Sequence, residues 1–299
     1  MATYAQIVKQ AEKQRIRITN QQRIQIANIF AESASDIGKN LSYKIAMGDD
    51  IKNDYVIDYA RELKRNSKYI FNDVKQSIVT GNLNTARCVT DAQSNFWGNI
   101  NPALQQRVQD SMSKIPQAVV NEIVSGGLYK DGNGLSSRIW RQKKAYEHDI
   151  DYIIERGIVE KKSALELAQD LQQYVKPGAQ KSFDWKTCYP GAQEKVDYNA
   201  QRLARTSNTH AYQMAFQRST RDNPFITQYQ WHSSNSGRVC PLCAEMDGKL
   251  FDKDDVPLDH PNGMCVITAV IEKDYDQIAD EIADYVNGGS NPDLDNWLT

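Results

Sequence analysis

Four side chains in the last quarter of the sequence have the types and spacing of metal ligands. Two residues separate Cys240 from Cys243, and His260 and Cys265 follow after a loop, in the pattern C-x2-C-x16-H-x4-C. Zinc takes thiolate and imidazole ligands tetrahedrally, and two cysteines at this spacing can present both sulfurs from one tight turn. Three cysteines and one histidine would close the shell, with no position left for water. The spacing therefore predicts a structural Zn²⁺ site made by Cys240, Cys243, His260 and Cys265.

Two other interpretations of this cluster stay open. The thiols could be buried without a metal, or residues 258–262 could belong to a metal-dependent nuclease of the His-Asn-His type. Such a nuclease needs a second His or Asn on a following helix, and usually a second cysteine pair, but no Cys or His follows Cys265. A zinc deaminase needs a His-x-Glu motif, which the sequence lacks. No phosphate-binding glycine loop or catalytic triad is recognisable. We therefore expect no enzyme, with the nuclease as the alternative.

Helices are expected to dominate the elements that position this cluster. Residues 1–125 show no strand-like alternation of apolar and polar side chains. Apolar side chains recur there at helical spacing, which is typical of ordinary helical core. Two such stripes are Tyr55, Tyr59 and Leu63, and then Ile70, Val74 and Ile78.

The middle of the chain carries signals for helix starts and stops. Gly, Asn, Asp and Ser concentrate between Ser125 and Ser137, which predicts a boundary there. A helix follows, with Gly157 as its expected stop. Ser163 and Glu166 form a capping box that opens the next helix, and Pro177-Gly178 is expected to close it.

Around the cluster, a long helix is expected from Glu194 to about Arg221. Strands are predicted at Phe225 to Trp231 and at Cys265 to Ile271, and they are expected to pair across the cluster. Trp297, in an acidic tail, could dock on another protein or fold back onto its own domain. The fold class is therefore mainly α with a small α+β C-terminal module, in which long helices precede a short β-hairpin built around the Cys/His cluster.

Composition limits the setting of the protein. The sequence has no secretory signal pattern, no apolar run long enough to cross a membrane, and five cysteines, so we expect a reducing cytosol and no membrane partner. The net charge of −2 is uneven: from Ala244 onward 14 acidic residues face three lysines, which gives −11 and leaves +9 for the rest. The basic part could be an ordinary solvated surface, or it could contact double-stranded DNA without sequence preference.

A family resemblance rests on residues that surround the cluster. In chain order these are Ala204-Arg205-Thr206, Ala211, Trp231, Cys240-Pro-Leu-Cys243, Asp247-Gly248, Phe251 and His260-Pro-Asn262. Their order resembles the minor head proteins of tailed bacteriophages, the head morphogenesis or Mu F-like family, over roughly residues 130–272. The family commonly has His-Pro-x-Cys-x-Cys, whereas Gly263 stands here in place of the first of those cysteines. Cys265 alone then remains to complete the ligand set.

The resemblance implies a structural minor capsid protein. It implies binding to the portal protein and to the major capsid or scaffold protein on the inner face of the procapsid, and a role in head assembly and in DNA packaging or ejection. The expected location is the virion interior near the portal, after assembly in the host cytoplasm. The expected division is a helical N-terminal domain at 1–125, a helical connecting region at 126–193, the minor-head-protein core with the zinc module at 194–273, and an acidic tail at 274–299.

Overall fold

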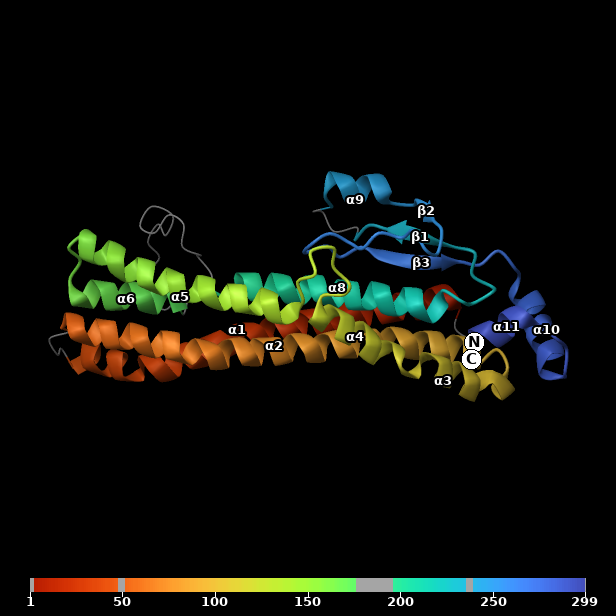
Figure 1. Ribbon diagram of the computed structural model, residues 1–299, viewed down its shortest axis with the longest axis horizontal. Helices are drawn as coiled ribbons and strands as arrows, with labels where there is room; N and C mark the ends of the chain where they lie inside the picture. The colour runs from red at the N-terminus through yellow and green to blue at the C-terminus, as the bar shows by residue number, and fades with distance from the viewer. Residues whose placement is uncertain (1–2, 48–51, 176–195, 235–238, 299) are drawn as a thin grey trace. The chain divides into compact units, whose positions relative to one another are not determined.

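The computed structural model describes residues 3–47, 52–175, 196–234 and 239–298 (Figure 1). Helices form most of this part of the chain, as the sequence predicts. In chain order they are α1 (Tyr4–Met47), α2 (Asn53–Gly98), the 3-10 helix η1 (Pro102–Leu104), α3 (Gln105–Ser113), α4 (Ile115–Ser125), α5 (Leu135–Val159), α6 (Ala164–Val175), α8 (Tyr198–Thr220), α9 (Pro241–Met246), α10 (Tyr275–Val286) and α11 (Pro292–Trp297).

The chain forms two compact units, each built from separate segments. Unit 1 comprises Met1–Gln21, Ile78–Gly132 and Leu203–Thr299, and unit 2 comprises Gln22–Ser77 and Asn133–Arg202. One division, between Gly132 and Asn133, falls inside the glycine-rich connection that the sequence predicts as a boundary. The other divisions fall within helices, where a linear sequence carries no boundary signal.

Unit 1 contains a three-stranded antiparallel sheet. Its strands are β1 (Gln228–His232), β2 (Leu250–Phe251) and β3 (Val266–Val270), in the order β2-β1-β3. The predicted pairing of the first and last strands is confirmed, with Trp231 opposite Ile267. They do not form a hairpin, because the chain between them adds β2 to the other edge of β1, with Phe251 opposite Tyr229.

The sheet packs on helices of unit 1, and its buried side chains Tyr229 and Trp231 join one apolar core with α2 and α8. Figure 1 shows the sheet lying along α8, with α9 beyond it. Trp97 of α2 is fully buried in this core and stacks on Phe225, with ring centroids 5.9 Å apart. Aromatic side chains thereby join the start of β1 to the helices.

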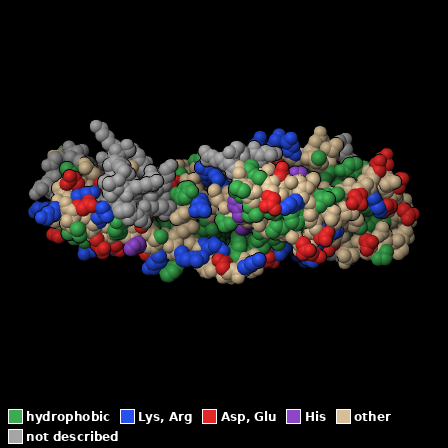
Figure 2. Space-filling view, turned by 90° about the horizontal axis from the view of Figure 1, so that it is seen from above, with side chains coloured by type: hydrophobic (Ala, Val, Ile, Leu, Met, Phe, Trp, Pro, Cys, Tyr) green, Lys and Arg blue, Asp and Glu red, His purple; other side chains and the backbone are tan. Residues whose placement is uncertain are grey.

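The acidic C-terminal residues fold onto unit 1. Ile278 and Ile282 on one face of α10 are fully buried, as is Leu294 of α11. Trp297 packs edge-on against Trp97, with ring centroids 5.6 Å apart, so it folds back onto its own domain. Figure 2 shows acidic side chains on the surface of the part of unit 1 that contains α10 and α11.

Unit 2 contains the α5–α6 pair and the parts of α1 and α2 assigned to it. The capping box is confirmed, because Glu166 N–H donates to Ser163 Oγ and Ser163 N–H donates to Glu166 Oε2. The predicted stop at Gly157 is wrong by two residues, since α5 continues to Val159. A Cβ at Gly157 would lie 2.5 Å from Leu167 Cδ1, so this glycine serves close packing of α5 on α6. Pro177-Gly178 lies outside the described residues.

The two predicted apolar stripes are largely core, since Tyr59, Leu63, Ile70, Val74 and Ile78 are buried in α2. The start of the helix expected from Glu194 lies outside the described residues, and the described part of it, α8, ends at Thr220. Across the described part of the chain, every helix is too short or too polar to span a bilayer.

Candidate metal centre

The first part of the candidate centre is the Cys-Pro-Leu-Cys turn that begins α9. Cys240 is the N-cap residue, and its Sγ accepts a hydrogen bond from Cys243 N–H over 3.4 Å. Pro241 occupies the first helical turn, where its missing N–H costs no hydrogen bond. The turn therefore places two sulfurs close together through local geometry alone. We call this segment, residues 240–243, the cysteine arm.

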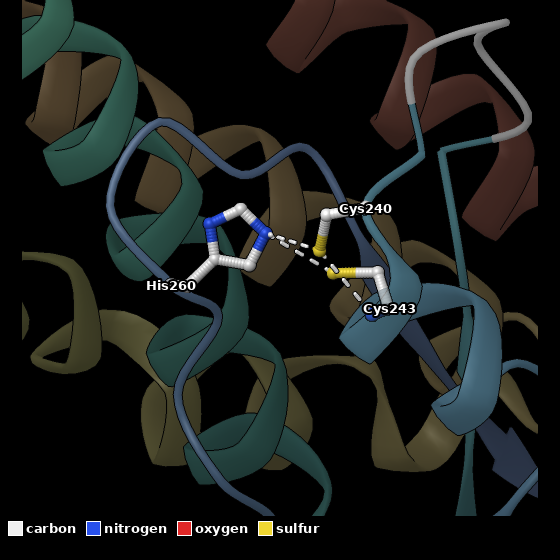
Figure 3. A group of neighbouring side chains, drawn as sticks. All are labelled: Cys240, Cys243 and His260. Carbon is white, nitrogen blue, oxygen red and sulfur yellow. Dashed lines mark hydrogen bonds between the residues drawn. The ribbon is translucent and has the colours of Figure 1, made fainter.

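The second part is the loop that leads into β3, residues 257–265, which we call the histidine arm. His260 Nε2 lies 3.1 Å from Cys243 Sγ and 3.4 Å from Cys240 Sγ (Figure 3). His260 Nδ1 lies 3.0 Å from the Pro261 carbonyl oxygen. We assign the ring proton to Nδ1, which donates it to this carbonyl and leaves the Nε2 lone pair facing both sulfurs.

The three converging donors fit zinc. Bond lengths of about 2.3 Å to sulfur and about 2.0 Å to nitrogen at a tetrahedral angle put a sulfur and a nitrogen ligand about 3.5 Å apart. The distances of His260 Nε2 to the two sulfurs are close to this value. In many metal sites a ligating histidine donates its other ring N–H to a backbone carbonyl, which orients the ring. The Pro261 carbonyl is in position to do this for His260. Cys240, Cys243 and His260 are thus a group that could hold a metal ion.

Cys265 is buried close to Cys243. Its sulfur forms a second group with Cys243 Sγ and an Asp259 carboxylate oxygen, in which these atoms lie within 4.8 Å of one another. Cys243 belongs to both groups, and Cys240 and His260 belong only to the first. The four-ligand set that the sequence predicts is therefore brought into one neighbourhood, and Cys265 as its fourth ligand stays a prediction.

The charge states of the cysteines differ with their surroundings. Hydrogen bonding from Cys243 N–H, with His260 nearby, lowers the pKa of the Cys240 thiol. Burial raises the pKa of the Cys243 thiol, and burial together with Asp259 raises that of Cys265. A cation that binds thiolates would offset the cost of ionising the two buried sulfurs.

Asp259 organises the histidine arm from within. Its carboxylate is buried and accepts hydrogen bonds from His260 N–H at 2.8 Å and from Cys265 N–H at 2.9 Å. A Cβ at Gly263 would collide with that same carboxylate. This contact gives the physical reason why glycine stands at position 263, because a cysteine there would have to displace Asp259.

Side chains of α8 hold the outer positions of the arm. Gln213 accepts from Asp259 N–H at 3.0 Å and donates to the Pro257 carbonyl at 2.5 Å. His210 Nε2 lies 2.9 Å from the Asp259 carbonyl oxygen, and the ring is buried. His210 is therefore a packed histidine that orients the loop.

Deeper contacts join the arm to α8 and to α1 within unit 1. Thr209 Oγ1 donates to the Gly263 carbonyl at 3.0 Å and accepts from Arg15 at 3.1 Å. Arg15 also donates to the Met264 carbonyl at 3.0 Å and is almost completely buried. Arg15, Thr209, Gln213 and Asp259 carry no motif signal in the sequence. Only the fold reveals that they support the centre.

The residues that carry the family resemblance gather around this centre. Thr206 accepts from Asn262 N–H at 2.8 Å, which joins the Ala-Arg-Thr motif to the His-Pro-Asn motif. Gly248 has a φ of 79° and donates to the Trp231 carbonyl at 2.8 Å. The Phe251 ring packs on Trp231, with centroids 6.3 Å apart. Motifs that are separated along the sequence therefore form one structure.

Fold and site together define a mainly helical protein whose small sheet and Cys/His centre form one module. Residues 147–266 match the family described as phage Mu protein F like protein. This match includes Cys240, Cys243, His260, Cys265 and the strands β1 and β2, and it ends at the first residue of β3. The match supports a Mu F-like phage head morphogenesis family for this part of the chain. None of the curated proteins compared with the chain matches it, and no solved structure does either.

Proposed function

We propose that this protein is a structural minor capsid protein that binds the portal protein and the inner face of the procapsid and assists head assembly. The observation that carries the proposal is the phage Mu protein F like match over residues 147–266, which spans the Cys/His centre. The major capsid or scaffold protein is the further partner. The protein resides in the virion interior near the portal, after assembly in the host cytoplasm.

The centre contributes stability to a docking module in this proposal, with zinc held by Cys240, Cys243, His260 and Cys265. Thiolate and imidazole ligands suit zinc, and a structural zinc ion holds segments that lack enough core of their own. The cysteine arm fits this description, because α9 has six residues and exposes Leu242. The module acts without catalysis and presents a rigid surface to the portal.

The experiment for this proposal is assembly of heads in the presence and in the absence of the portal protein. The chain is produced together with the portal, scaffold and major capsid proteins of the same phage, and procapsids are purified by sedimentation. We expect the chain in the procapsid fraction at few copies, and its absence when the portal protein is omitted. Procapsids that contain portal but never this chain would overturn the proposal.

A nicking assay separates the proposal from the nuclease alternative. The purified chain is incubated with supercoiled plasmid and Mg²⁺, Mn²⁺ or Zn²⁺, and His260→Ala serves as the matched variant. We expect intact plasmid with both proteins and a lower thermal unfolding temperature for His260→Ala. If the wild-type chain nicks the plasmid and His260→Ala does not, the nuclease alternative would replace the structural role.

A further inference from the structure

An exposed aromatic and basic groove lies in unit 2, far along the sequence from the metal centre. Its floor is formed by the buried side chains Phe71 and Ile139, which come from α2 and α5. Tyr69 and Trp140 stand at its rim, with 65% and 58% of their surfaces exposed. Exposed apolar side chains that gather in one patch with a polar rim can mark a binding site. We call this feature the Trp140 groove.

Trp140 also lines a second hollow. There it stands with Ser136, Ser137 and Arg141 of the same helix. Lys144 Nζ lies 5.9 Å from the centroid of the Trp140 ring. Trp140 thus borders both hollows, with the Lys144 ammonium near its ring and more than half of its surface exposed to solvent.

The charge around both hollows is positive. Lys68, Lys75 and Lys143 line the groove and Arg141 lines the second hollow, and neither lining contains an acidic residue. Lys143 is paired with Glu147 at 2.6 Å. Among the residues that the structure describes, Lys68, Lys75 and Arg141 form no ion pair. Three unneutralised cations therefore surround two exposed aromatic rings.

We propose that the Trp140 groove binds a single-stranded polynucleotide, with bases stacked on Trp140 and Tyr69 and phosphates held by Lys68, Lys75 and Arg141. Sites for single strands combine a basic groove with aromatic side chains, since an unpaired base can stack on a ring. Serine and asparagine side chains also commonly contact phosphates. Ser136, Ser137 and Asn72 line the hollows.

Two other occupants fit these side chains less well. A duplex keeps its bases stacked on one another. Its phosphates could contact the cations, but no base would stack on Trp140 or Tyr69. A protein partner would need an interface core in which lysine is depleted, whereas three of the nine residues in this lining are lysines. The inference goes beyond the proposed head function and does not depend on it, and its test requires only the purified chain.

The test measures binding of the full chain to fluorescent 20-mers by anisotropy, with an oligo-dT strand and a mixed-sequence duplex as probes. Trp140→Ala is expected to weaken single-strand binding about tenfold, because stacking of one base contributes on that scale, and to leave duplex binding unchanged. The triple variant Lys68→Glu, Lys75→Glu, Arg141→Glu is expected to lower single-strand affinity further and to reduce the slope of log K against log salt by about 2.

Matched controls come from exposed residues elsewhere in the chain. Tyr43→Ala removes an aromatic ring that is 62% exposed on α1, and Lys9→Glu with Lys130→Glu reverses charges in unit 1. We expect the wild-type affinity for oligo-dT to change less than twofold with Tyr43→Ala. Circular dichroism of each variant, equal to wild type, shows that the helices are intact.

Three results would overturn the inference. The first is equal loss in Trp140→Ala and Tyr43→Ala, and the second is unchanged single-strand binding by the triple variant. The third is displacement of oligo-dT by polyglutamate at equal charge concentration, together with equal oligo-dT affinity of wild type and Trp140→Ala. That result would assign the groove to an acidic polypeptide. None of these results bears on incorporation into procapsids, so this inference and the proposed head function fail separately.

Discussion

The two arms of the candidate metal centre are built in different ways. The cysteine arm is local: a six-residue helix starts at Pro241, and the Cys240 sulfur caps it through Cys243 N–H. The histidine arm has no helix or strand of its own before β3 and is held by side chains distant in sequence, including Gln213, Thr209 and Arg15. One arm is shaped by its own few residues and the other by the body of unit 1.

This difference predicts where the centre is vulnerable. A change in the histidine arm or its supports should leave buried hydrogen-bonding groups without partners and lower the stability of unit 1. A change in the cysteine arm should remove a ligand and disturb little else. Substitutions in both arms test this contrast, in order of decreasing expected effect on stability.

Asp259→Ala should have the largest effect. The substitution leaves His260 N–H and Cys265 N–H without an acceptor in a buried loop, and it removes a negative charge near the buried Arg15. We expect the free energy of unfolding to fall by about 3 kcal/mol or more, measured by denaturant titration of the metal-free protein. The exposed Asp255→Ala is the matched control and should change it by less than about 0.5 kcal/mol.

Gly263→Ala should come next. The new Cβ collides with the Asp259 carboxylate, which cannot retreat without losing its two hydrogen bonds. We expect a loss of about 2 kcal/mol in the same titration, a typical cost of overpacking. Gly127→Ala is the control, since its nearest contact would be an ordinary 3.6 Å. Equal stability of the two variants would show that the carboxylate moves freely and that the histidine arm is looser than described.

Gln213→Ala should remove two hydrogen bonds that hold the histidine arm on α8. It removes the acceptor for Asp259 N–H and the donor to the Pro257 carbonyl. The expected loss is about 1 to 2 kcal/mol by thermal or chemical unfolding. Gln217→Ala on the same helix is the control, since within the described residues its side chain makes no hydrogen bond. An equally large loss of stability in Gln217→Ala would show that the effect comes from substitution in α8 and not from the lost contacts to the histidine arm.

Cys240→Ser should have the smallest effect on stability and a large effect on metal content. Serine is a good N-cap, so the metal-free protein should change by less than about 0.5 kcal/mol. Metal content by plasma mass spectrometry should fall from about one zinc per chain to well below it. Cys88→Ser, in α2 and outside both cysteine groups, should retain the metal.

Cys265→Ser completes this last comparison. If Cys265 is the fourth ligand, its serine variant loses zinc as Cys240→Ser does, and we expect that result. If Cys265→Ser retains zinc and Cys240→Ser loses it, Cys265 is not a ligand. The protein ligands would then be Cys240, Cys243 and His260.

The sequence predicts much of this protein because several of its signals are local. The capping box at Ser163 depends on residues three positions apart, and the apolar stripes of α2 depend on helical spacing. The pair Cys240 and Cys243 likewise identifies a turn that can present two sulfurs. β2 escapes prediction because its two residues gain their pairing from β1 and have no alternation of their own.

The sequence by itself determined which side chains could bind a metal and that helices would position them, because ligand type, spacing and helical periodicity are properties of neighbouring residues. Only the tertiary structure decided how the histidine arm is held, why position 263 is glycine, and that Trp140 and Tyr69 share one basic groove. Those features depend on atoms that are distant along the chain and meet only when the helices pack. Hydrogen bonds and excluded volume act between such atoms irrespective of their separation in sequence.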